Sequence, residues 1–231
     1  MRPAFLPPRA VAVGVFVLCL VIAALGCAIA AGCSPVSIGI DTSKANTSGA
    51  LLLGEAVGET FVAADTLVTR FTVWRVASED SSWQIGIHPY FVETDTTPSW
   101  CNWPACPPDG YPATGRVVWD GPTQVVKYGD GVHPIEFTWT FDPPLVLPHR
   151  GKFAWFVLQD PCAAYFDILA VDRADAYPDG IAWYTSRSHC DRLIEAYPIP
   201  NADHVFTIEF CRDASTPVRR TSWGKLKTIY R

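Results

Sequence analysis

The stretch that decides the fold class is Ile135-Glu136-Phe137-Thr138-Trp139-Thr140-Phe141. Every odd position is apolar and every even position is polar. Because successive side chains of a β-strand point to opposite faces, this alternation predicts a strand with one packed face and one solvated face. The segment 204–210 repeats the pattern, with Phe206, Ile208 and Phe210 on the apolar side.

Similar runs fill the body of the chain, each rich in β-branched or aromatic residues and bounded by Gly, Pro, Asp or Ser. The segment 153–158 is apolar on both faces, which indicates a central strand covered on both sides. We therefore expect an all-β fold, an antiparallel two-sheet sandwich of jelly-roll type over residues 50–212. The predicted strands are 58–63, 67–76, 83–92, 116–128, 135–141, 152–159, 165–171, 181–185 and 204–211.

Composition agrees with this fold and excludes one class of partner. The 231 residues include 20 prolines and 16 glycines, which suits many short strands joined by turns better than long helices. The formal net charge is -5. Nucleic-acid binding needs a concentrated basic face, and the body of the chain has none.

The first residues predict export. Arg2 and Arg9 precede an uncharged apolar run over 10–31, which is typical of a signal peptide or of an N-terminal membrane-anchor helix. Residues 28–30 fit an Ala-x-Ala cleavage site, whereas Cys27 and Cys33 each end a stretch that resembles a lipoprotein signal. We expect residues 1–33 to be signal or anchor and 34–49 to be a linker. The protein would then lie in the cell envelope, membrane-anchored or secreted.

Cysteines in an exported protein are expected to pair. We predict one disulfide between Cys101 and Cys106 and another between Cys162 and Cys190. One cysteine is then left over beyond the signal, and two outcomes stay open. Cys33 can remain a thiol and pair with Cys211, which would tie the first strand to the last, or it can be lipidated, which would leave one downstream thiol free.

The order of several landmarks resembles a known group. They are the segments Gly-Glu-Thr-Phe at 58–61, Trp-Thr-Phe at 139–141, Gly-Lys-Phe-Ala-Trp-Phe-Val-Leu at 151–158 and Tyr-Pro-Asp-Gly at 177–180. This order is similar to galactose-binding-like, carbohydrate-module-type jelly rolls of bacterial surface proteins, over roughly residues 54–211. The resemblance implies a jelly roll and a carbohydrate ligand. The chain departs from the group at Asp179, where members tend to have glycine, and in the cysteine-rich insertion around Cys101.

One loop is suggestive of ligand binding. Trp100, Asn102 and Trp103 lie in a turn that a disulfide would close, and flat aromatic faces bury the apolar faces of sugars while polar neighbours fix orientation. The competing interpretation is that these tryptophans cap the end of the core.

Catalytic signals are missing from the sequence. Its five histidines are scattered, and it contains neither a Gly-x-Ser-x-Gly elbow nor a His-Glu-x-x-His motif. We predict no enzyme, no catalytic residue and no cofactor. Acidic turns at 128–131 and 172–175 offer oxygen ligands for calcium, but at lower density than a dedicated calcium loop.

The C-terminal residues 213–231 form a basic tail. Trp223, Lys225 and Lys227 combine aromatic and cationic character there, which favours docking to a membrane surface or a partner; a disordered tail is the competing interpretation. Our first hypothesis is a non-enzymatic envelope module that binds carbohydrate or another envelope ligand. The alternative is a structural or assembly protein that binds another protein through its sandwich surface and tail, and a secreted hydrolase is third.

Overall fold

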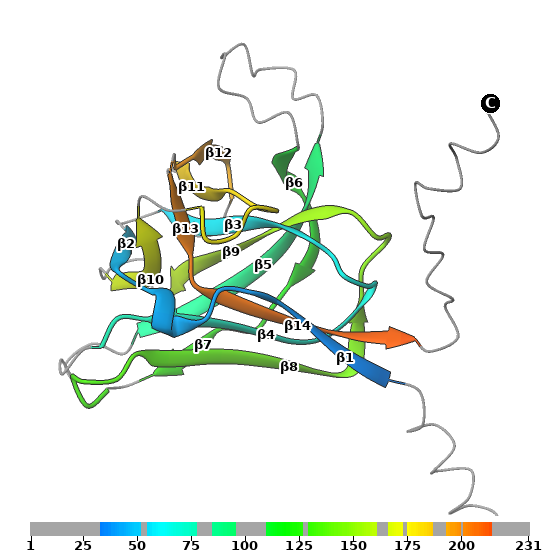
Figure 1. Cartoon of the computed structure of the whole chain (residues 1–231). Coiled ribbons are helices and arrows are strands. Elements are labelled where there is room, and N and C mark those ends of the chain that lie inside the picture. Colours follow the sequence, from blue (N-terminus) through cyan, green and yellow to red (C-terminus); the bar gives the residue numbers. More distant parts are fainter. Residues whose placement is uncertain are drawn as a thin grey trace, which may run out of the picture. The chain divides into compact units, whose positions relative to one another are not determined.

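Strand β9 (Lys152–Asp160) lies near the middle of one of two antiparallel sheets, as its two apolar faces predict. The structure is a computed structural model (Figure 1). It describes residues 33–51, 55–77, 85–95, 110–126, 129–160, 166–172, 175–186, 193–199 and 201–213. Residues 35–211 form one compact unit. Of the other unit, the terminal segments, only residues 33–34 and 212–213 are described.

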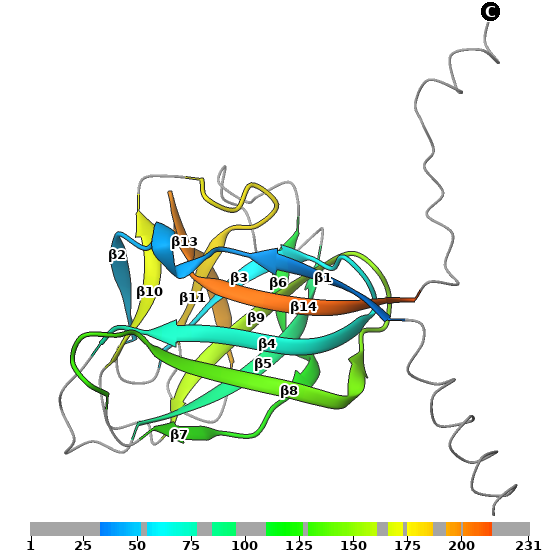
Figure 2. The same cartoon turned by 60° about the horizontal axis from the view of Figure 1, so that its bottom comes forward.

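The sheet that contains β9 runs β12 (Glu195–Pro198), β11 (Ala182–Ser186), β3 (Ala56–Val62), β9, β5 (Ile85–Asp95) and β6 (Tyr111–Asp120), and β7 (Gln124–Val126) also pairs with β5. We call it sheet B. Sheet A runs β1 (Cys33–Gly39), β14 (Phe206–Asp213), β4 (Leu67–Arg75), β10 (Phe166–Asp172) and β13 (Ala202–His204). Strand β8 (Ile135–Val146) pairs with β4, and β2 (Thr47–Leu51) pairs with β10. Figure 2 shows β1, β14, β4 and β8 side by side across sheet A.

The main core lies between the two sheets and is mostly aromatic. The odd-numbered residues Phe153, Trp155 and Val157 of β9 meet Phe71 of β4 and its neighbours there. The rings of Phe71 and Trp139 stack with their centroids 5.4 Å apart. Alternation along β4, β8 and β14 thus places apolar side chains inward, as their sequences predict.

A second core covers the other face of β9. Ala154, Phe156 and Leu158 pack with residues that include Tyr111 of β6 and Trp183 of β11. Sheet B is curled, and its outer strands β12 and β6 approach each other. The curl lets sheet B bury its own second face, so β9 needs no third layer to cover it.

Most of the predicted strands are confirmed, two expectations are corrected, and two further short strands were not predicted. The linker prediction for 34–49 is wrong, because these residues supply β1, the short 3-10 helix η1 (Thr42–Lys44) and part of β2. The single strand predicted over 116–128 is divided after Asp120, where Gly121 donates its N–H to Pro89 O (3.0 Å). Strands β12 and β13 were not predicted, since each is only three or four residues long.

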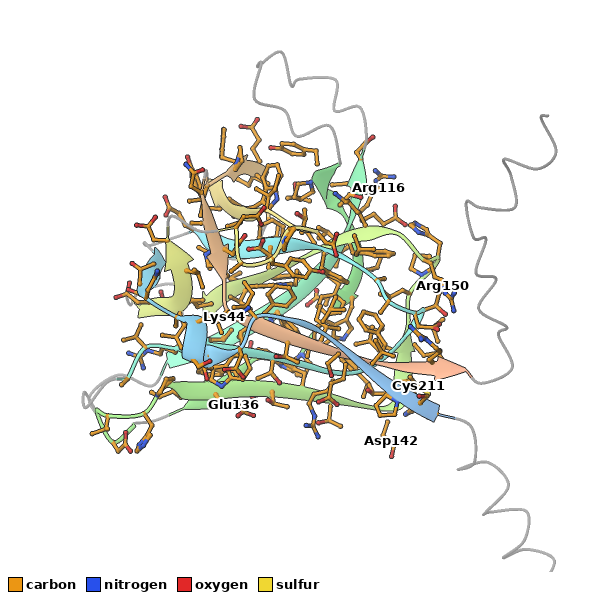
Figure 3. The ribbon with its side chains drawn as sticks, in the orientation of Figure 1. Lys44, Arg116, Glu136, Asp142, Arg150 and Cys211 are labelled. Carbon is orange, nitrogen blue, oxygen red and sulfur yellow. The ribbon has the colours of Figure 1, made fainter. Side chains whose placement is uncertain are left out.

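Cys33 and Cys211 form a disulfide. Cys211 lies near the end of β14 (Figure 3), and β1 is the neighbour of β14 in sheet A. A sulfur atom in this bond carries no lipid. The structure therefore supports the first of the two outcomes for Cys33, in which it pairs with Cys211.

Of the signal or anchor segment predicted over residues 1–33, residues 1–32, including the lipidation candidate Cys27, lie outside the described residues. Among those described, no helix is long and apolar enough to cross a bilayer.

Breaking the Cys33–Cys211 bond should destabilise the domain strongly. In the chain-entropy account a disulfide that closes a loop on the order of 100 residues or more stabilises by about 5 kcal/mol. We expect Cys33→Ser and Cys211→Ser each to lower the free energy of unfolding in urea by about 3 to 5 kcal/mol.

The double variant serves as the control, because it should be no less stable than the single ones. Non-reducing peptide mapping that finds Cys33 bonded to a different cysteine would contradict the assignment.

Candidate functional site

The best candidate site is a hollow of about 330 Å³ at one end of the sandwich. Two connections form most of it: residues 175–181, which follow β10, and the turn at Asn201 between β12 and β13. Asn201 has φ 59°, a left-handed conformation that asparagine tolerates well in tight turns. We call it the polar hollow, lined by Lys152, Asp175, Pro178, Asp179, Gly180, Ile181, Ile199, Asn201, Ala202 and Asp203.

Three polar side chains of the hollow are exposed and unengaged. Asp175, Asp179 and Asn201 form no hydrogen bond to any group in the described part of the chain. Beside them, Ile181 and Ile199 supply apolar surface. The hollow thus offers two carboxylates and one amide for hydrogen bonding to a ligand.

The buried side chain of Asp203 holds the loop that lines the polar hollow. It is 4% exposed, and its Oδ2 accepts hydrogen bonds from the backbone N–H groups of Ala176 (2.7 Å) and Tyr177 (3.2 Å). Burial raises the pKa of Asp203, and the two N–H donors oppose that shift. Asp203 therefore ties the start of the 175–181 loop to β13.

The far end of the loop is tied to β3. Thr60 Oγ1 accepts from Ile181 N (2.8 Å), and Thr60 N donates to Ile181 O (3.0 Å). Gly180 has no room for a side chain, because a Cβ there would lie 2.1 Å from Thr60 O. The loop is thus held at both ends by hydrogen bonds, and its close approach to β3 requires glycine.

Glu59 lies behind Asp203, inside the core between the sheets. It is 0% exposed, because Val57, Glu59 and Phe61 share the inward face of β3. Its Oε2 accepts from His204 N (3.0 Å), and its Oε1 has no partner within hydrogen-bond distance among the described residues. Burial raises the pKa of Glu59 well above 4.5, and the nearby charge of Asp203 adds to the shift.

His204 completes this buried cluster. It is 1% exposed, and its Nδ1 donates to Gly58 O (2.9 Å) across the two sheets. Burial lowers the pKa of His204 to about 4, so the ring is neutral at neutral pH. Glu59, Asp203 and His204 form a polar cluster that joins β3 of sheet B to β13 of sheet A.

A second hollow of about 550 Å³ lies on the other side of the 177–179 turn. It is bordered by residues 37–41, by Val62 at the end of β3 and by Tyr177, and it shares Asp179 with the polar hollow. The Tyr177 hydroxyl accepts from Val62 N (3.4 Å), which ties the 177–179 turn to the end of β3.

One arrangement resembles a catalytic relay. His88 Nδ1 lies 3.1 Å from Thr123 Oγ1, and His88 Nε2 lies 2.5 Å from Asp120 Oδ1. Both partners flank the corner between β6 and β7, and the His88 ring stacks on Tyr90 at 4.6 Å. We interpret these contacts as structural: they stabilise the corner between β6 and β7.

Among the predicted binding residues that the structure describes, Asp175 of the acidic turn at 172–175 lines the polar hollow. Asp130, in the other acidic turn, accepts from Val132 N (2.9 Å) and His133 N (2.7 Å). In the described part of the chain, no cluster of three or more His, Cys, Asp or Glu side chains is arranged to hold a metal. The remaining predictions concern residues outside the described ranges, namely Trp100, Asn102, Trp103, Cys101, Cys106, Cys162, Cys190, Trp223, Lys225 and Lys227.

Sequence reasoning missed Glu59 and Asp203, although one signal was available. The alternation Val57-x-Glu59-x-Phe61 places a carboxyl group on the apolar face of a predicted strand. A buried charge of this kind needs a partner and marks a functional or structural cluster. Nothing in the local sequence indicates that Asp203 is the partner, because β13 was not predicted.

The sequence matches no protein-family model and no curated protein. The resemblance to galactose-binding-like modules therefore stays a prediction.

The buried His204 makes the fold sensitive to acid. Its pKa is about 4 in the folded state and about 6.5 when unfolded, so its contribution to stability is present above 6.5 and is lost as the pH falls. We expect this loss to amount to about 1.4 kcal/mol per pH unit between those values.

His204→Asn keeps an N–H donor for Gly58 O and cannot titrate. Subtracting its urea-unfolding profile from that of the wild type should isolate the acid-dependent loss. His149→Asn, which changes an exposed histidine, is the matched control. Parallel profiles for the wild type and His204→Asn would show that the buried ring does not titrate as described.

Proposed function

We propose that this chain is an exported, non-enzymatic binding module of the cell envelope and that its polar hollow binds a carbohydrate. The observation that carries the proposal is the convergence of three unengaged polar side chains, Asp175, Asp179 and Asn201, on a hollow whose loop is held at both ends. A rigid frame keeps such groups in position before the ligand arrives, which lowers the entropic cost of binding.

The chemistry of these groups suits a polyol. Each carboxylate accepts hydrogen bonds from hydroxyl groups, and the Asn201 amide both donates and accepts. Ile181 and Ile199 can contact the C–H groups of a sugar ring. The volume of about 330 Å³ lies at the small end of the usual range for ligand sites, roughly 300 to 1,000 Å³, which favours one or two sugar units.

The jelly-roll topology and the relation to carbohydrate modules belong to the same proposal. Two antiparallel sheets, one of them curled, support it, and so does the order of the landmarks quoted above. Lys152 and Tyr177 to Gly180, which carry part of that resemblance, line or border the polar hollow.

The disulfide favours an additional role in docking. Cys33 is the last residue of the predicted export segment, and Cys211 lies just before the predicted basic tail, which begins at residue 213. Both segments are therefore covalently tethered to one point. An export segment retained as an anchor would keep the cationic tail close to the membrane, where each Lys or Arg near an anionic surface contributes about 1 kcal/mol.

A glycan array probed with the purified chain, followed by titration calorimetry, tests the carbohydrate proposal. Asp179→Asn and Asn201→Gly should each weaken binding about tenfold, as expected for the loss of one hydrogen bond to the ligand. Glycine is chosen at 201 because it accepts the left-handed backbone.

Glu136→Gln, on the exposed face of β8 in sheet A (Figure 3), is the control and should bind like the wild type. The proposal fails if no glycan binds. The assignment to the polar hollow fails if Trp100→Ala or Trp103→Ala abolishes binding while the hollow variants leave it intact.

A further inference from the structure

We propose that the ligand of the polar hollow is an uncharged linear oligosaccharide, longer than a disaccharide, that continues past Asp179 into the second hollow. This inference rests on the proposed function, because it names the ligand class of that same site. The polar hollow alone, at about 330 Å³, has room for one or two sugar units. The second hollow is larger, at about 550 Å³, and therefore has room for at least one more.

The two hollows are neighbours that share one carboxylate. Asp179 is exposed and lines both of them, whereas Pro178 lines the polar hollow and Tyr177 the second hollow. A sugar unit that binds Asp179 from the polar hollow therefore lies next to the second hollow. The following unit of a linear chain can enter it there without losing the first contact.

The turn between the two hollows is held in place by three hydrogen bonds. Asp203 Oδ2 accepts from Tyr177 N (3.2 Å), and the Tyr177 hydroxyl accepts from Val62 N (3.4 Å). Gly180 N donates to Tyr177 O (3.0 Å) and closes the turn. The shared carboxylate of Asp179 is thus carried by a turn whose backbone is fixed on both sides.

The residues that follow β1 form another wall of the second hollow, and this wall is fixed as well. Ile40 N donates to Phe206 O (2.8 Å), and a Cβ at Gly39 would lie 2.0 Å from that same oxygen. Gly39 has φ 127°, a conformation that favours glycine. Asp41 Oδ1 accepts from Ser43 N (2.8 Å). The second hollow is therefore formed before a ligand arrives, which lowers the entropic cost of binding.

The lining of the second hollow suits a sugar better than a purely apolar ligand. Val62 is 36% exposed although it is a large apolar residue, and Ile38 adds further apolar surface. Ser37 and Thr207 supply hydroxyl groups that have no hydrogen-bond partner in the part of the chain that the structure describes. A sugar ring presents C–H groups to the first kind of surface and hydroxyl groups to the second.

The charges around the two hollows disfavour acidic sugars. Asp41, Asp175 and Asp179 are exposed carboxylates that line one hollow or both. Among the described lining residues, Lys152 is the one basic side chain. An anionic sugar chain would be repelled by these like charges, whereas an uncharged one would not.

Chemical-shift mapping by NMR on the full isotope-labelled chain tests the inference directly. The probes are the uncharged malto-, cello-, manno- and xylo-oligosaccharides, from disaccharide to pentasaccharide, with oligogalacturonides as the anionic series. The disaccharide of a series that binds should shift the backbone amides of residues 175–181 (Pro178 excepted) and leave those of 37–41 unchanged. The tetrasaccharide should also shift the amides of 37–41, Val62 and Thr207.

Titration calorimetry of the same probes gives the second readout. The affinity should rise about tenfold from disaccharide to tetrasaccharide, as expected for one or two added hydrogen bonds, and oligogalacturonides should bind more weakly or not at all.

Ser37→Trp, at an exposed position that lines the second hollow, should remove this gain and leave the affinity for the disaccharide unchanged. Thr140→Trp, at an exposed position of β8 outside the linings of both hollows, is the matched control and should keep the gain. Equal urea-unfolding midpoints check that both variants fold.

The inference is overturned if the tetrasaccharide binds no tighter than the disaccharide or leaves the amides of 37–41 and Thr207 unshifted. It is also overturned if Ser37→Trp keeps the gain, or if oligogalacturonides bind as tightly as the uncharged series. Each of these results, with the disaccharide bound, leaves the proposed function standing. No binding at any length would refute the proposed function, and this inference with it.

Discussion

The structure depends on the burial of both faces of β9. Because Phe153, Trp155 and Val157 point to one side and Ala154, Phe156 and Leu158 to the other, sheet B must be covered twice. Sheet A supplies one cover. The curl of sheet B supplies the other, and the same curl brings β11 and β12 round to the end of the sandwich where the polar hollow forms.

Within this frame a buried polar cluster lies close to the hollow, because Asp203 lines the hollow and its neighbour His204 donates to Glu59. Glu59 occupies an inward position of β3 and accepts a hydrogen bond from His204 N, while the adjacent Asp203 accepts from Ala176 N and Tyr177 N of the loop. Polar groups buried in this way are costly unless they are satisfied, and Glu59 Oε1 has no hydrogen-bond partner among the described residues. The hydrogen bonds that the cluster does make join β3 to β13 and β13 to the loop. We interpret this cluster as the feature that holds the 175–181 loop and the turn at Asn201 in fixed positions.

The strands with clear alternation could be predicted from the sequence, and so could the central position of 153–158. The strands within residues 34–49 could not be predicted, because this segment lacks a sustained alternation of apolar and polar residues. Strands β1 and β2 are rich in small polar residues and owe their conformation to pairing with β14 and β10. The hollow could not be predicted either, since Asn201 meets Asp175 and Asp179 only where two connections between the sheets, β10 to β11 and β12 to β13, lie together. Glu59 left a signal in its position on an apolar face, whereas the pairing of Cys33 with Cys211 was one of two outcomes that cysteine parity allowed.

The most direct test of the central claim is NMR mapping of the bound carbohydrate on the isotope-labelled chain. The account predicts that chemical-shift changes concentrate on the backbone amides of residues 175–181 (Pro178 excepted) and 201–203. Changes that leave these amides untouched and gather on the exposed face of β8 and β14 would contradict it.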